Sequence, residues 1–185
     1  MRASILLLAA LTISAGAFAA DKADPSALLR GHFDNAAQAK ASNGTVPAVT
    51  VDIDPAPQAG WTLWHVHIQT DPESTFDQTW AMQLRKEHDG SSALIPYYEL
   101  KQDATPKADA FDPGKWLSLE ACALRGAMTR ERAEGIAEGE PCVAVSMNVG
   151  ARRALLPVGF TLDATSLQLD MNLRGVRTRI ETKRD

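Results

Sequence analysis

Apolar and polar residues alternate along several short runs between residues 46 and 182, and turn-forming residues separate these runs. Such a period of two is typical of β-strands whose two faces meet different surroundings. In the run 61–69, one face carries Thr62, Trp64, Val66 and Ile68, and the other carries Trp61, Leu63, His65, His67 and Gln69. In the run 75–86, one face carries Phe76, Gln78, Trp80, Met82 and Leu84. The chain is therefore predicted to be mainly β.

Further strands are expected at 46–53, 93–100, 116–119, 142–149, 154–162, 166–171 and 176–182. Eight or nine short strands joined mostly by tight turns favour an antiparallel sheet. A sheet of that size best protects its edges by closing into a barrel, whose interior has room for side chains or one small ligand. We expect a lipocalin-like barrel of the calycin type, and a β-sandwich is the alternative. The polar segment 101–115 is expected to be a loop, and the charged segment 129–138 a helical turn or two.

The barrel is predicted to follow an N-terminal α-helix. Asp24 before Pro25 is typical of a helix start, with a capping carboxylate and a proline at the first helical position. Apolar residues recur at helical spacing until Asn43-Gly44, at Leu28, Leu29, Phe33, Ala36 and Ala37. Asn35 and Gln38 lie either on an exposed face of this helix or in contacts that fix it against the mouth of the sheet.

Residues 1–19 are typical of a secretory signal peptide. Arg2 provides the positive charge, residues 5–15 are apolar, and Ala17-Phe18-Ala19 is a small-x-small cleavage site. We therefore expect a periplasmic or secreted protein whose mature part, residues 20–185, is a single barrel domain. No segment has the roughly 20 apolar residues that a membrane-spanning helix needs, so no membrane span is predicted.

The net charge of −4 is spread along the chain without a basic tract. Nucleic-acid binding domains usually carry a basic patch or stripe, so nucleic acid is not expected as a partner.

Cys122 and Cys142 are the only cysteines. In an oxidising compartment such a pair is most simply a disulfide, worth roughly 3 kcal/mol for a loop of this length. A reactive thiol or a metal pair is the alternative.

Several candidate site residues can be interpreted in more than one way. His65 and His67 share a strand face and could bind a metal, but an exposed polar face explains them equally well, and we predict no metal site. Arg85 is either an anion clamp or part of a surface salt bridge. Aromatic residues could line a ligand cavity or simply fill the core, namely Trp64, Trp80, Tyr97 and Tyr98. Tyr97 and Tyr98 should point to opposite faces. No pattern identifies catalytic residues.

Several segments, taken in order, resemble the CpcT/CpeT-type chromophore (phycobilin) lyases over roughly residues 27 to 175. They are the opening Leu29-x-Gly31-x-Phe33-Asp34-Asn35-x-x-Gln38, the strand Trp61-x-Leu63-Trp64, the strand Phe76-Asp77-Gln78, and the spaced Cys122 and Cys142. The resemblance implies a calycin-type barrel that holds a linear tetrapyrrole, a bilin, and attaches it to a cysteine of an acceptor protein. No other cofactor is implied.

On this resemblance the ligand-binding residues are expected to be Asn35, Gln38, Trp64, Phe76, Gln78 and Trp80. The lyases have arginines on both sides of the glutamine, where this chain has Asp77 and Thr79. Paired arginines would clamp the bilin propionates, and Asp77 would repel them. The alternative is therefore a periplasmic lipocalin-like protein that binds an apolar ligand without catalysis. A partner-binding barrel with a filled interior is a third hypothesis.

Overall fold

The computed structural model describes residues 25–71, 74–99, 110–138, 142, 155–173 and 175–185. The strands are β1 (Gly31–Asp34), β2 (Ala48–Pro55), β3 (Trp61–Asp71), β4 (Ser74–Lys86), β5 (Ser92–Glu99), β6 (Trp116–Ser118), β7 (Leu124–Gly126), β8 (Arg132–Ala137), β9 (Pro157–Asp163), β10 (Ser166–Leu173) and β11 (Val176–Arg184). The helical elements are α1 (Ala36–Ala41) and the 3-10 turns η1 (Pro25–Ala27), η3 (Pro113–Lys115) and η4 (Glu120–Cys122).

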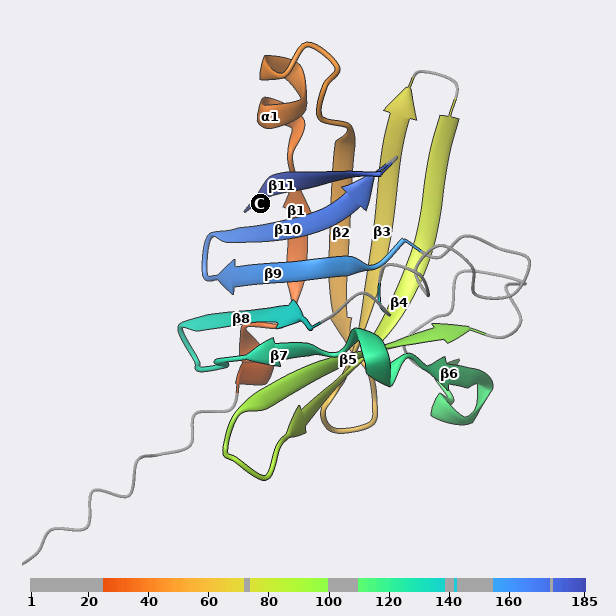
Figure 1. Cartoon of the computed structure of the whole chain (residues 1–185), viewed down its shortest axis with the longest axis vertical. Helices are drawn as coiled ribbons and strands as arrows, with labels where there is room; N and C mark the ends of the chain where they lie inside the picture. The colour runs from red at the N-terminus through yellow and green to blue at the C-terminus, as the bar shows by residue number, and fades with distance from the viewer. Residues whose placement is uncertain (1–24, 72–73, 100–109, 139–141, 143–154, 174) are drawn as a thin grey trace, which may run out of the picture.

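These strands form one antiparallel sheet that closes on itself. Its order is β4-β3-β2-β1-β11-β10-β9-β8-β7-β5-β6, and β4 also pairs with β5, so that ten strands make a ring and β6 is attached to β5 outside it. In Figure 1, β2, β3 and β4 run along the long axis, and β9, β10 and β11 cross in front of β2. The predicted antiparallel β-barrel is confirmed, with ten strands in the wall rather than eight or nine.

The side chains that the alternation places on one face point into the interior of the barrel. Trp64 lies directly opposite Trp80 in the register of β3 and β4, and both residues are fully buried. The same inner face carries Val66 and Ile68 from β3 and Met82 from β4. The two strands therefore present the faces that the sequence predicts, because their large apolar residues recur without a break in period.

The N-terminal helix is wrong over most of its predicted length. Residues Gly31–Asp34 form strand β1 instead, which pairs with β2 on one side and β11 on the other. Gly31 has a φ of +129°, which a helix does not allow and which favours glycine. Phe33 is fully buried in the core as a strand residue. Only the six residues of α1 are α-helical, and Asp24 lies outside the described residues.

The helical turn expected at 129–138 is also wrong, since Arg132–Ala137 is strand β8. Its buried residues, Ala133 and Gly135, are small, so the strand lacks the bulky alternation that marks β3 and β4. Its charged residues lie outside. Of the strand predicted at 142–149, only Cys142 belongs to the described residues, and the loop predicted at 101–115 is described only from residue 110.

A second apolar cluster lies on the outer side of the wall. It consists of Leu63, Ala81, Phe111 and Trp116, with Trp61 and Tyr97 packed against it. Trp61 contacts Tyr97 and Phe111 with ring centroids 4.6 and 5.2 Å apart. This cluster explains why the outward face of β3 begins with apolar residues before it becomes polar at His65. Within the described part of the chain, no helix is both long and apolar enough to cross a membrane.

Candidate functional site

Four of the six predicted ligand-binding residues come together on the inner face of β3 and β4. Opposite pairs in the register are Ile68 with Phe76, Val66 with Gln78, and Trp64 with Trp80. The Trp64 and Trp80 ring centroids are 6.3 Å apart. Phe160 of β9 meets Trp64 edge to face at 6.1 Å. The result is an aromatic inner wall into which Gln78 introduces one carboxamide.

The two tryptophans differ in how their indole N–H groups are satisfied. Trp64 Nε1 donates to Thr62 Oγ1 at 3.0 Å. Trp80 Nε1 is buried and has no hydrogen-bond partner among the described residues. Since Trp is a donor only, this N–H can be satisfied by nothing but an acceptor. The N–H of Trp80 is therefore available to an acceptor group inside the barrel.

Gln78 adds a second unpartnered donor on the same face of β4. Its Oε1 accepts a hydrogen bond from the Leu155 backbone N–H at 3.1 Å, whereas its Nε2 is buried and has no partner in the described part of the chain. The whole residue is 8% exposed. An unsatisfied buried polar group costs about 1–3 kcal/mol. Two such donors, two positions apart on one strand face, suit a ligand that carries acceptor oxygens.

Asn35 and Gln38 use their polar groups within the protein. Asn35 Nδ2 donates to the Pro47 carbonyl at 2.9 Å, and its Oδ1 accepts from the Val49 N–H at 2.7 Å. Gln38 Nε2 donates to the Arg179 carbonyl at 3.2 Å, and its Oε1 accepts from the Glu181 N–H at 3.0 Å. These bonds join the start of α1 to β2 and β11. They give both residues the fixing role that was one of the two considered from sequence.

The histidine pair lies on the outer face, where each ring has a partner on β4. His65 Nδ1 is 2.9 Å from Thr79 Oγ1, and His67 Nδ1 is 2.5 Å from Asp77 Oδ1. Asp77 and Thr79 thus point away from the interior, which corrects the expectation that Asp77 would repel a ligand in the barrel. Among the described residues, no group of three or more His, Cys, Asp or Glu is placed to hold a metal ion.

A third histidine, which the sequence analysis did not single out, extends this polar outer face. His32 Nδ1 lies 2.5 Å from Asp52 Oδ1, and that hydrogen bond raises the pKa of His32 above 6.5. In the register, His32 is opposite Asp52, and Asp52 is opposite His65. His32 faces Asp52 because residues 31–34 form strand β1 beside β2. The N-terminal helix expected from the sequence contains no such pairing.

A hollow of about 850 Å³ lies beside His32. It is lined by Arg30, Gly31, His32, Asp52, Ile53, Asp54, Pro55, His65 and Arg184.

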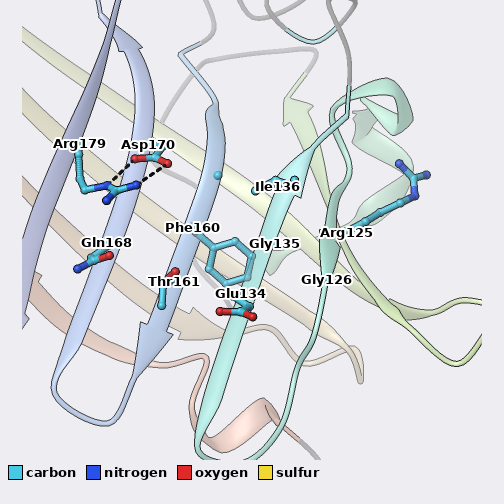
Figure 2. A pocket seen from close by; sticks show the side chains of 11 residues that line it. Arg125, Gly126, Glu134, Gly135, Ile136, Phe160, Thr161, Gln168, Asp170 and Arg179 are labelled. Carbon is cyan, nitrogen blue, oxygen red and sulfur yellow. Dashed lines mark hydrogen bonds and ion pairs between the residues drawn. The ribbon is translucent and has the colours of Figure 1, made fainter.

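A further hollow of about 370 Å³ lies on the outer face across β7 to β11 (Figure 2). Successive strands contribute Arg125, Ile136, Gly159, Asp170 and Arg179, which lie opposite one another in the register. Gly159 leaves the middle of this row without a side chain. Arg179 Nε donates to Asp170 Oδ1 at 3.0 Å, and Figure 2 shows the pair facing each other. The charges of this hollow are therefore matched within the protein.

Arg85 does not face the interior. It forms ion pairs with Glu87 at 2.9 Å and with Glu120 at 2.5 Å, and these bonds raise the pKa of its guanidinium above the usual value. Of the two interpretations of Arg85, the surface salt bridge is confirmed and the anion clamp is wrong.

The two tyrosines point to opposite faces, as the sequence predicts. Tyr98 belongs to the inner cluster, and Tyr97 packs against the outer cluster.

The two cysteines lie together in the inner cluster. Both are present as free thiols, Cys122 fully buried and Cys142 1% exposed. The neighbouring Cys142 side chain and burial raise the pKa of the Cys122 thiol. The pair that the sequence predicts to be a disulfide is thus brought into contact, in its reduced form.

Comparison with known proteins adds no relative: no protein-family model matches the chain, and no curated protein matches it. The resemblance to the chromophore lyases therefore stays a prediction that rests on the quoted residues. The structure accounts for part of that signature without a ligand, because Asn35 and Gln38 fasten the barrel wall. The remaining part, on β3 and β4, lies where a ligand inside the barrel would be bound.

Proposed function

We propose that this chain is an exported, lipocalin-like barrel protein that binds an apolar ligand against the inner face of β3 and β4. The ligand presents an acceptor oxygen, from a carbonyl or a carboxylate, to Trp80 Nε1 and Gln78 Nε2. The observation that carries the proposal is this pair of buried donors, which have no partner among the residues that the structure describes. A bound acceptor would recover the cost of leaving them unsatisfied, and the neighbouring aromatic rings would supply apolar contact.

A linear tetrapyrrole is the ligand class that we propose, on the strength of the resemblance to the chromophore lyases. A bilin is long and largely apolar, and its lactam carbonyls and propionates are hydrogen-bond acceptors. The outward positions of Asp77 and Thr79 support this choice. Asp77 is engaged with His67 on the outer face, so the acid that replaces a family arginine does not oppose an anionic group inside the barrel.

Binding, rather than covalent transfer, is the activity that the inner residues support best. An indole N–H and a carboxamide can hold and orient a ligand, but neither group acts as a nucleophile or a general base at neutral pH. Delivery of the bilin to a cysteine of an acceptor protein is the further activity that the family resemblance implies. Such delivery would depend on positioning the bound chromophore for attack by the acceptor's thiol.

We also propose that the protein is exported. This part of the proposal rests on the sequence, because residues 1–19 lie outside the described residues. A periplasmic or secreted location follows from the signal-peptide pattern of Arg2, the apolar run 5–15 and Ala17-Phe18-Ala19. Ligand detected by mass spectrometry on protein purified from its own periplasm would identify the natural ligand and test the location together.

The binding test is a titration of the purified mature protein with biliverdin, followed by the absorbance of the bilin and by tryptophan fluorescence. Trp80→Phe and Gln78→Leu each remove one donor, and each should weaken binding roughly tenfold, which corresponds to about 1.4 kcal/mol. Gln168→Leu and Trp116→Phe are the matched controls. Gln168 is on the outer face of β10 and Trp116 is in the outer cluster, so neither change should alter the affinity.

Three contrary outcomes separate the hypotheses. No spectral change at tens of micromolar biliverdin would exclude the tetrapyrrole as the ligand. Binding that is weakened equally by the inner and the outer substitutions would exclude the inner face of β3 and β4 as the site. If neither biliverdin nor any co-purified molecule binds, the barrel is a filled scaffold and the proposed function is wrong.

A further inference from the structure

β7 is the shortest of the ten strands that make up the ring of the barrel. β7 has only three residues, Leu124–Gly126. It pairs with β5 over Ser92–Leu94, and its regular ladder with β8 covers Leu124 and Arg125. Beyond Gly126 the two segments are joined by the hydrogen bond from Glu134 N–H to the Ala127 carbonyl and by an isolated bridge between Met128 and Ala133. Segments with few regular ladder hydrogen bonds open locally at a lower free energy than the rest of a fold. We call β7 and β8 the seam of the barrel.

The two cysteines bracket this seam. Cys122 ends η4, immediately before β7, and Cys142 follows β8 in the chain. Both side chains are buried and belong to the same inner cluster. The segment between them contains both seam strands. A covalent bond at this point would close the chain into a loop around the seam.

We propose that Cys122 and Cys142 form a disulfide in the mature protein and that this bond clasps the seam of the barrel wall. Two S–H bonds break and one S–S bond forms. The two electrons and two protons pass to an external disulfide, either that of an oxidoreductase or that of oxidised glutathione, which is reduced to two thiols. The inference does not depend on ligand binding. It depends on export only in the cell, where the compartment supplies the oxidant.

Burial dictates when this bond forms. With exposed fractions of 0% and 1%, neither sulfur is accessible to a large disulfide donor once the barrel is complete. Exchange requires a thiolate to attack a disulfide sulfur directly. Oxidation must therefore precede closure of the wall around the pair, or wait for the seam to open. The reduced folded protein should react with a thiol reagent far more slowly than the unfolded chain.

The first test is made on the unaltered protein, so it does not depend on a variant that folds. The chain is refolded in a glutathione redox buffer, its free thiols are trapped with N-ethylmaleimide after denaturation, and its intact mass is measured. We expect a product lighter by two hydrogens that takes up no maleimide. A fully folded product that takes up maleimide at both cysteines would overturn the proposal, and refolding without redox buffer gives the reduced reference.

The second test asks what the bond holds. Amide hydrogen exchange is compared between the oxidised and reduced protein, and between the oxidised protein and a Cys122→Ala/Cys142→Ala variant. We expect exchange in β7 and β8 to accelerate roughly tenfold or more on reduction, while exchange in β2 and β3 changes little. Equal acceleration everywhere, or none in the seam, would show that the disulfide does not act as its clasp. A loss of biliverdin binding without these changes would bear on the proposed function alone.

Discussion

The two sides of the barrel wall are built differently. On one side, β2 pairs with β3 from Ala48 to Pro55, and β3 pairs with β4 from Trp61 almost to the tip of the hairpin. On the other, β7 is a three-residue strand whose regular ladder with β8 covers Leu124 and Arg125, followed by an isolated bridge between Met128 and Ala133. The long-strand side carries the unpartnered donors of the proposed ligand site, whereas the short-strand side carries the cysteines. The proposed ligand site is thus built on the long strands, and the proposed disulfide flanks the short ones.

The largest effect is expected from Gly126→Ala in the short-strand side. A Cβ at Gly126 would lie 2.2 Å from the backbone carbonyl oxygen of Glu134, and no side-chain motion relieves a backbone clash. We expect a loss of about 4 kcal/mol in the free energy of unfolding, at the upper end for single substitutions, measured by urea denaturation. Gly159→Ala is the control: its Cβ would meet only ordinary contacts from 3.4 Å and should cost less than about 1 kcal/mol. Equal effects would show that the seam is not held by close backbone approach.

The next largest effect is expected at Asn35 and Gln38, whose hydrogen bonds join the start of α1 to β2 and β11. Asn35→Ala removes the hydrogen bonds to Pro47 and Val49 and leaves a buried backbone N–H without its partner. We expect a loss of about 2–3 kcal/mol in the free energy of unfolding. Gln38→Ala, whose bonds to Arg179 and Glu181 are exposed to water, should cost about 1 kcal/mol or less. Chemical denaturation of both variants measures the difference, and a larger cost for Gln38→Ala would reverse this assignment.

A smaller effect distinguishes the two facing tryptophans of the long-strand side. Trp64→Phe and Trp80→Phe remove the same atoms from fully buried sites, but only Trp64→Phe breaks a hydrogen bond and leaves the Thr62 hydroxyl alone. In the absence of ligand, Trp64→Phe should therefore be the more destabilising by about 1 kcal/mol. Thermal or urea unfolding of the two variants supplies the comparison. If Trp80→Phe is the more destabilising, Trp80 Nε1 has a partner in solution and the ligand proposal loses one of its donors.

The smallest effect is a pH dependence on the outer face. The hydrogen bond that His32 donates to Asp52 raises the folded-state pKa of His32 above 6.5, so protonated His32 stabilises the fold. This contribution is fully present below the unfolded pKa of about 6.5. It is lost as the pH rises through the higher folded-state pKa. NMR titration of the His32 ring should give a midpoint above 6.5, and Asp52→Asn should lower it. An unchanged midpoint in that variant would rule out Asp52 as the cause.

The parts of the fold that the sequence predicts correctly are those whose inward side chains are large. Trp64, Val66 and Ile68 mark β3 because nothing else explains bulky residues at every second position. β8 was missed because Ala133 and Gly135 mark no face, and its outward charges resemble a helix surface. β1 was missed because Leu29 and Phe33 are also four residues apart on a helix. Only the conformation of Gly31 separates the two interpretations, and that conformation depends on partners from both ends of the chain.

The candidate site shows a similar limit. The inner face of Phe76, Gln78 and Trp80 follows directly from alternation. Which tryptophan retains a free N–H does not, since it depends on Thr62 turning its hydroxyl to Trp64 rather than to Trp80. The outward placement of Asp77 also follows from alternation with Gln78, although comparison of the strand with the lyase motif alone suggested that Asp77 would meet the ligand.

The pairing of β1 with β11 sets the order in which this molecule can be completed. The first strand, Gly31–Asp34, has β11, Val176–Arg184, as its second neighbour. A growing chain therefore presents β1 and β10 as open edges until β11 has been made. Barrel closure must follow the synthesis of β11, and it joins strands that are far apart in the sequence, an arrangement associated with slow folding. A chain that stopped before Val176 would keep both edges exposed and prone to pair with other chains.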